Sequence, residues 1–342
     1  MKPLSTAAES ALVVMEQQSS KPVEEWAAQF FSGTRGMLVV GHGTADATGS
    51  SETLAVARLV AQMLPGVPVE LGFLEVIGPS IGEALLQLAA RGCREVVAAP
   101  LLLFTAGHAR QDVPDALREG ALAAGVVVRQ AEALGCLPEI VLLARQRRSE
   151  ALARLTPLAS AETALVMVGR GSSDPDALRQ LQAFTAATLD STDLSQYAPQ
   201  YAPQYAPLAG QFFQPGRVEI GFVTAARPTL AEALAAAAGT ASSAVREKIF
   251  LAGNPFPTIN RRMLDEHPKP SDPVPLRIIV QPHLLFGGHV HKQVLEAMNC
   301  CREQHPDIEW VEVDRLGPAS LVAAALLRRA GEAAHTFDSC GI

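Results

Sequence analysis

Residues 101–114 read LLLFTAGHARQDVP, and this stretch decides how the rest of the sequence is interpreted. The apolar run 96–103 ends in the small residues 105–107, and a polar helical pattern follows from His108 onward. A continuous apolar run of this length, bounded by small residues, is typical of a strand buried on both faces of a parallel sheet. His108 then lies just past the carboxyl end of that strand, on the edge where open α/β sheets bind ligands. Taken alone, His108 is equally compatible with a helix cap or an ordinary loop residue.

The composition is that of an ordinary globular protein, with 342 residues, 48% hydrophobic and 18% charged, which is enough for about two domains. A net charge of −7 argues against nucleic acid or an anionic membrane as the main partner, because both need a basic surface. The sequence has no apolar run long enough for a transmembrane helix and no signal-peptide layout at its start. We therefore expect a cytoplasmic protein.

Five scattered cysteines without a CxxC pair predict reduced thiols and no thiolate zinc site. An iron–sulfur cluster has no cysteine spacing to support it.

Strand-like apolar segments alternate with amphipathic helical segments over the first 150 residues. This alternation predicts a parallel sheet covered by helices on both faces. The expected strands are 37–40, 69–74, 96–103 and 126–134, and the expected helices are 51–64, 79–92, 113–124 and a last one from 138.

The same pattern occurs a second time, which indicates an internal repeat. Matched segments follow in the same order: 165–172 mirrors 37–44, 221–224 mirrors 72–75, 228–234 mirrors 79–85, 288–289 mirrors 107–108 if one loop residue is dropped, and 316–317 mirrors 134–135. We therefore predict two similar α/β domains, residues 1–155 and 156–342.

Two insertions distinguish the second domain. Residues 196–207 repeat the tetrapeptide QYAP, and a proline every fourth residue predicts an exposed, extended loop. Residues 254–275 are rich in proline and charge, and the sequence does not say whether they form a lid or an elaboration.

Polar residues follow each of the first three expected strands: His42, Glu75 and His108. Neighbouring strands are about 4.8 Å apart, so these side chains can converge on one ligand. Two imidazoles and a carboxylate suit a first-row divalent metal, and the imidazoles could also accept protons. The glycines of segment 41–44 would alternatively suit a phosphate, but this loop has neither the GxGxxG nor the Walker pattern.

The ordered set of strand-end motifs resembles the class II tetrapyrrole chelatases, and within them the sirohydrochlorin chelatases of the CbiX and SirB type. The motifs are GHGT at 41–44, FLE at 73–75 followed by Pro79-Ser80, and PLLLF at 100–104 running on through His108 to Asp112. The resemblance covers about residues 37–143, and the second domain matches more loosely. It implies two similar α/β halves with the tetrapyrrole in the cleft between them.

The resemblance further implies insertion of a divalent metal ion into sirohydrochlorin, with His42 and His108 as the catalytic, metal-handling pair and Glu75 assisting. The function we expect is that of a cobaltochelatase of cobalamin biosynthesis. The alternatives are a ferrochelatase of siroheme synthesis and a non-catalytic metal- or tetrapyrrole-binding protein. No permanent cofactor is expected, because the metal, Co²⁺ or Fe²⁺, is a substrate. The expected partner is the small-molecule tetrapyrrole, and a monomer is expected, with a homodimer as the alternative.

The second domain departs from the motif, since Arg170 stands in the place of His42 and Thr224 in that of Glu75. Arginine stays charged and cannot act as a base, so we predict a single active site, in the first domain. We interpret Arg170 as a contact for substrate carboxylates, which arginine binds in bidentate fashion. Arg227 is a second candidate for that role, with a solvated surface charge as the alternative for both.

The remaining residues that we assign to substrate binding are Arg110, Gly43, Thr44 and His289. His283 and His291 are interpreted as loop or core histidines.

Overall fold

The computed structural model describes residues 22–31, 33–104, 108–174, 176–190, 213–239 and 274–339, without the side chains of 108–110 and 336–339. The repeat at 196–207, nearly all of the insertion at 254–275 and the segment 105–107 lie outside the described residues. Two four-stranded parallel sheets form the molecule, in the orders β2-β1-β3-β4 and β6-β5-β7-β8. The predicted α/β class with two similar units is confirmed. We call the unit built on the first sheet the first half and the other unit the second half.

In the first half, helices α4 and α5 cover one face of the sheet, and α2 and α3 lie on the other. Apolar side chains of both helix layers pack on the strands and form the core. The elements are α2 (Val23–Ala28), β1 (Arg35–Gly41), α3 (Ala47–Met63), β2 (Val69–Phe73), α4 (Ile81–Ala90), β3 (Glu95–Pro100), α5 (His108–Ala124) and β4 (Val127–Gln130).

The second half repeats this arrangement, with α9 and α12 on one face and α7 on the other. Its central strands pair in the same register, since Gly169 lies opposite Phe222 as Gly41 lies opposite Phe73. The elements are η1 (Ser160–Glu162), β5 (Thr163–Gly169), α7 (Asp176–Leu189), β6 (Arg217–Phe222), α9 (Leu230–Ala237), β7 (Arg277–Pro282), α12 (His289–Gln304) and β8 (Glu309–Glu312).

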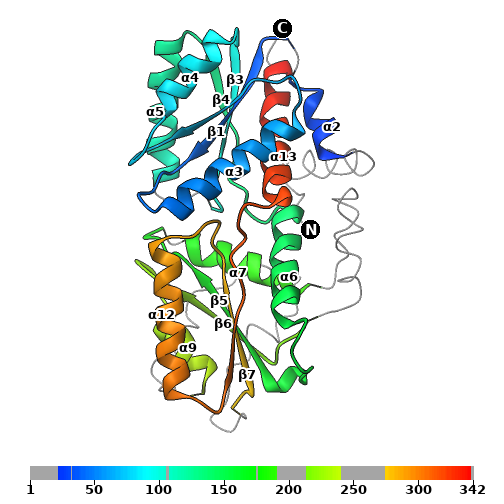
Figure 1. Ribbon diagram of the computed structural model, residues 1–342, viewed down its shortest axis with the longest axis vertical. Helices are drawn as coiled ribbons and strands as arrows, with labels where there is room; N and C mark the ends of the chain where they lie inside the picture. The colour runs from blue at the N-terminus through cyan, green and yellow to red at the C-terminus, as the bar shows by residue number, and fades with distance from the viewer. Residues whose placement is uncertain are drawn as a thin grey trace, which may run out of the picture.

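Two helices are exchanged between the halves. Helix α6 (Pro138–Leu152) follows the first sheet but packs against α7 and β8, whereas α13 (Ser320–Ser339) follows the second sheet but packs against α2, α3 and β3 (Figure 1). Where they meet, Arg328 of α13 donates to Glu139 of α6 from Nε at 2.7 Å and from Nη2 at 2.5 Å, with both side chains almost fully buried. The exchange makes each half depend on a helix supplied by the other.

A reciprocal pair of arginines fixes the two exchanged helices. Arg147 of α6 donates to the carbonyl of Leu316 at 3.0 Å, and Arg329 of α13 donates to the carbonyl of Ala133 at 2.8 Å. The two acceptors lie in equivalent loops of the repeat, so the same anchoring is built twice.

Some predicted boundaries differ from the structure by a few residues. Helix α3 begins at Ala47 rather than 51, because the carboxylate of Asp46 accepts hydrogen bonds from two backbone N–H groups of the first turn, at 3.0 and 3.4 Å. Strand β3 ends at Pro100 rather than 103, because the backbone N–H of Leu102 turns back to the Pro100 carbonyl at 2.9 Å.

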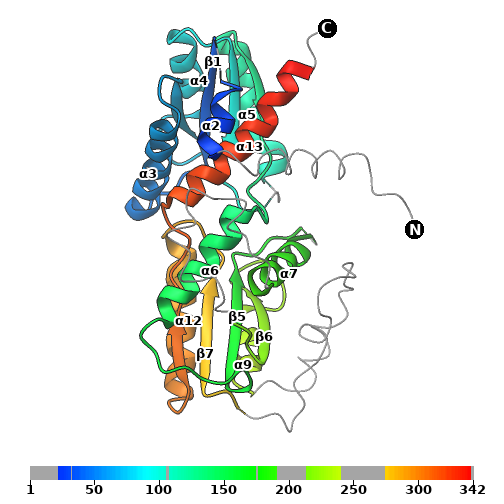
Figure 2. The ribbon, with the colours of Figure 1, turned by 90° about the vertical axis from the view of Figure 1, so that its right-hand side faces the viewer.

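The carboxyl ends of the strands lie towards the contact between the two halves, as β5 and β7 show for the second sheet (Figure 2). Helix α3, which follows β1, touches the loop that follows β7 there, with the backbone N–H of Gly287 bonded to Glu52 at 2.7 Å. This contact joins segments that follow strands of the two sheets. None of the helices in the described ranges is long and apolar enough to cross a membrane.

The helix exchange predicts how an isolated first domain behaves. Residues 1–155 expressed alone should not form a stable monomer, because the fragment lacks α13 and leaves the apolar surface of α2, α3 and β3 uncovered. Size-exclusion chromatography with light scattering and thermal unfolding would measure this. Co-expression with residues 156–342 is the control and should restore a 1:1 complex. A monomeric fragment that unfolds as cooperatively as the full chain would contradict the prediction.

Candidate functional site

Strands β1 and β2 bring His42 and Glu75 side by side beyond their carboxyl ends. The parallel pairing continues past the strands, with the N–H of Leu74 bonded to Gly41 O at 2.9 Å and the N–H of Glu75 bonded to His42 O at 3.0 Å. The side chains then meet, with His42 Nδ1 at 3.2 Å from Glu75 Oε1. Two of the three residues predicted to form the site are therefore in contact.

The loop between them needs a glycine at position 43. Gly43 has φ +96°, and a β-carbon there would overlap the carbonyl oxygen of Glu75. Glycine alone adopts this conformation without steric cost. Gly171 has φ +98° and lies against the Thr224 carbonyl in the same way. The two halves therefore share the backbone conformation of this loop and differ in the side chains that it carries.

The closeness of Glu75 bears on which nitrogen of the His42 imidazole can react, although the 3.2 Å contact does not have the geometry of a hydrogen bond. A carboxylate next to Nδ1 favours the tautomer with its proton on that atom, which leaves the Nε2 lone pair free to accept a proton or bind a metal. His42 is 30% exposed and Glu75 58% exposed at the side chain, so a ligand can reach both. Within the described part of the chain, no group of three or more histidine, cysteine, aspartate or glutamate side chains is arranged to hold a metal ion.

Helix α5 begins at His108, directly after the segment that leaves β3. Strand β3 pairs with β1, so the backbone of His108 follows the strand next to that of His42. The side chains of His108 and Arg110 lie outside the described residues, and their predicted roles stay predictions. Thr44 contributes to the loop itself, because its Oγ1 accepts a hydrogen bond from the N–H of Asp46 at 3.1 Å.

At the equivalent edge of the second sheet, Arg170 follows β5, and the hydroxyl of Thr224 donates to the Arg170 carbonyl at 3.0 Å. Arg170 is exposed, and its guanidinium forms no ion pair with any described residue. Arg227, by contrast, is paired with Glu232, so its charge is already compensated. His289 is exposed at the first position of α12.

A family model described as CbiX matches residues 36–151 and 272–333, which together make up more than half of the chain. The chain belongs to the CbiX family. The match covers all strands of the first sheet and, in the second, β7 and β8, so the half that holds His42 and Glu75 is the one that follows the family most completely.

Curated relatives of this CbiX-family chain carry two names. The sirohydrochlorin cobaltochelatase of Priestia megaterium is 28% identical over 160 residues, or 46% of this chain and 52% of the relative. The sirohydrochlorin ferrochelatase of Bacillus subtilis strain 168 is 28% identical over 165 residues, or 48% of this chain and 61% of the relative. The chain thus aligns with less than two thirds of the length of each. The solved structure of SirB from Bacillus subtilis with Fe³⁺ shares the fold, with a TM-score of 0.62 at 21% identity over 90% of this chain and 98% of that one.

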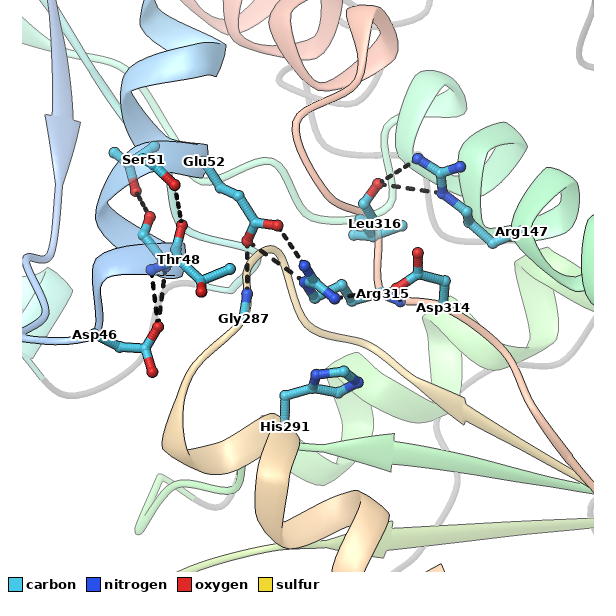
Figure 3. A network of polar contacts seen from close by, with 12 residues as sticks. Asp46, Thr48, Ser51, Glu52, Arg147, Gly287, His291, Asp314, Arg315 and Leu316 are labelled. Carbon is cyan, nitrogen blue, oxygen red and sulfur yellow. Dashed lines mark hydrogen bonds and ion pairs between the residues drawn. The ribbon is translucent and has the colours of Figure 1, made fainter.

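Sequence reasoning missed a polar network that joins the halves of this CbiX-family protein next to the site (Figure 3). Glu52 of α3 binds both the backbone N–H of Gly287 and the guanidinium of Arg315, two residues of the second half. No local pattern could have revealed these contacts, because their partners lie 235 and 263 positions away from Glu52.

His283 is buried, as expected for a core histidine. Its surroundings are unusual for a titratable side chain. It follows β7 at the position that Leu101 occupies after β3. Its ring lies between those of Phe104 and Phe184, with centroid separations of 4.9 and 3.8 Å. Neither ring nitrogen has a hydrogen-bond partner in the part of the chain that the structure describes. Burial lowers the pKa of His283 to about 3.

This environment predicts a pH-dependent stability that depends on His283. The unfolded chain protonates this imidazole near pH 6.5 while the folded protein keeps it neutral, so the unfolded state binds more protons and stability falls as the pH drops below 6.5. The loss should reach about 2 kcal/mol at pH 5. His283→Leu, which copies Leu101, should remove this loss, as measured by urea unfolding at pH 7.5 and 5.0. His335→Leu on α13 is the matched control, and an unchanged pH dependence in His283→Leu would contradict the assignment.

Proposed function

We propose that this protein is a sirohydrochlorin chelatase whose site is built around His42 and Glu75. The observation that carries the proposal is the 3.2 Å contact between His42 Nδ1 and Glu75 Oε1, at the carboxyl edge of a sheet in a CbiX-family fold. The names of the curated relatives support the same reaction class.

The residues present suit the chemistry of metal insertion. Two pyrrole N–H protons must leave the macrocycle as a divalent ion enters, so the net charge carried in equals the charge carried out. The Nε2 lone pair of His42 can accept one of these protons, and Glu75 stabilises the imidazolium that forms. His108 is proposed as the second imidazole. Imidazole and carboxylate ligands bind first-row metals without the affinity of thiolates, so the metal can pass on to the macrocycle.

Substrate binding is proposed to use both halves. At the equivalent edge of the second sheet, Arg170 forms no ion pair with any residue that the structure describes, and a guanidinium binds a carboxylate in bidentate fashion. Arg110, Gly43, Thr44 and His289 complete the proposed contacts. Since Arg170 cannot accept a proton, proton transfer is assigned to the first half alone.

We propose Co²⁺ as the metal substrate, for the synthesis of cobalamin, with Fe²⁺ for siroheme as the second candidate. The name of the Bacillus relative favours that second candidate, and the proposed ligands suit either ion. The direct experiment is to incubate the purified protein with sirohydrochlorin and either Co²⁺ or Fe²⁺, and to follow the visible spectrum of the macrocycle. Absence of insertion with both metals would disprove the proposal.

Replacing the proposed base tests the residue assignment. His42→Ala should lower kcat by about 100-fold or more, since a positioned acid–base group contributes that much, and Glu75→Gln should lie between this variant and wild type. Both side chains are partly exposed, so the melting temperature should change little. His305→Ala is the control, because His305 follows the C-terminal end of α12, whereas the proposed site lies at the N-terminal end of that helix. A rate near wild type in His42→Ala would refute the assignment.

Arg170→Ala tests the binding role of the second half. Loss of a contact made equally in the ground and transition states should raise KM for sirohydrochlorin about tenfold with little change in kcat. His289→Ala should likewise leave kcat near wild type. Arg118→Ala, which removes an exposed arginine paired with Asp115 on α5, is the control for net charge. A collapse of kcat in His289→Ala with an unaffected Arg170→Ala would overturn the single-site interpretation.

A further inference from the structure

Glu52 links three segments that come from both halves of the molecule. It lies on α3, and its Oε2 accepts a hydrogen bond from the backbone N–H of Gly287 at 2.7 Å. The same carboxylate pairs with Arg315, through Nη2 to Oε1 and through Nε to Oε2 at 3.4 Å (Figure 3). Gly287 belongs to the loop between β7 and α12, and Arg315 follows β8. One side chain therefore joins the first half to two loops of the second.

The backbones of the two halves touch at this place. A β-carbon at Gly49 would lie 2.8 Å from the carbonyl oxygen of Gly287, so the first turn of α3 meets the loop with no side chain between them. A second tie lies next to it, since Lys292 Nζ is 2.9 Å from Asp46 Oδ2. The hydrogen bond from Lys292 lowers the pKa of Asp46, which keeps this carboxylate charged.

Of the two ties, the one at Glu52 is the better shielded. The side chains of Glu52 and Arg315 are 13% and 19% exposed, whereas Lys292 is 65% exposed. The hydrogen bond to Glu52 is the main reason that the pKa of Arg315 is raised. Shielded, charge-assisted contacts hold geometry far better than exposed pairs, which contribute little. Removal of Glu52 would leave both the Arg315 charge and the Gly287 N–H without this acceptor.

The residues held by these two ties flank His289 in the sequence. It lies two residues after Gly287 and three before Lys292, and both of these are bonded to α3 or to its cap. Helix α3 in turn begins with the cap at Asp46, four residues after His42. We infer that Glu52 is a positioning residue, which holds the His289 loop of the second half against the His42 loop of the first so that both bind one tetrapyrrole. The inference rests on the proposed function. It adds the contact through which the two halves share one binding site.

Equilibrium binding of metal-free sirohydrochlorin, followed by quenching of its fluorescence, tests this role without turnover. Glu52→Ala and His289→Ala should each raise Kd about tenfold. If Glu52 acts through His289, the double variant should be no more than slightly weaker than either single variant, because coupled residues are not additive. Asp115→Asn, which breaks an exposed pair on α5, is the matched control and should bind as wild type does. Hydrogen exchange in peptides covering 284–291 should become faster in Glu52→Ala.

The outcomes separate this inference from the proposed function. A wild-type Kd in Glu52→Ala, or a double variant weakened by the product of the two single effects, would overturn the positioning role even if the enzyme inserts metal. Tight binding of sirohydrochlorin without insertion of either metal would disprove the chelatase function and leave the positioning role to be decided by the Kd values. A wild-type protein that does not bind sirohydrochlorin would overturn both. If Glu52→Ala does not fold, Glu52→Gln keeps an oxygen for the Gly287 N–H and should show an intermediate Kd.

Discussion

The buried ion pair between Glu139 and Arg328 is the contact on which the rest of the arrangement depends. It can form only where α6 and α13 meet, after each helix has crossed to the other half. Removing one partner of such a buried pair leaves an uncompensated buried charge at a cost of about 3–5 kcal/mol, so arrangements in which the two helices do not meet are strongly disfavoured. Since each sheet is completed by a helix from the other half, the halves fold as one unit. Their carboxyl edges are thereby held next to each other, which brings residues from both sheets into reach of one ligand.

On this scaffold the repeat keeps its backbone and changes its side chains. Gly43 and Gly171 have nearly the same φ, and each lies against the carbonyl of the residue two positions past the end of the neighbouring strand. The capping boxes of α4 and α9 are likewise duplicated. The positions of the proposed site have diverged, so that an imidazole with a carboxylate stands on one side and, on the other, a guanidinium without an ion-pair partner among the described residues. A duplicated backbone with unequal side chains is well suited to a substrate that needs a base on one side and anion recognition on the other.

Polar groups in this molecule separate into two kinds by their exposure. His42 and Glu75 are partly exposed, as side chains must be if they exchange protons or metal ions with a ligand. Glu52 and Arg315 are largely shielded, and shielding strengthens an electrostatic contact that has to hold two loops in place. Arg148 is an extreme of the second kind. It is fully buried, and its hydrogen bonds to Gln281 at 2.8 Å and to the Thr188 carbonyl at 2.7 Å dock α6 on the second sheet. Burial lowers the pKa of this guanidinium to about 9.

The sequence by itself determined the features that depend on local periodicity and turn chemistry. It predicted the alternating strands and helices, the internal repeat and the approach of His42 to Glu75, because parallel strands in register bring their ends together. It could not predict the exchange of α6 and α13. Both helices carry apolar surface that either sheet can bury, and only the tertiary structure decides which sheet does so. The tertiary structure also decided the tie between Glu52 and Arg315. It likewise decided the burial of His283 against two phenylalanines, where its ring nitrogens have no hydrogen-bond partner among the described residues. These contacts join residues far apart in the chain, and no local pattern encodes them.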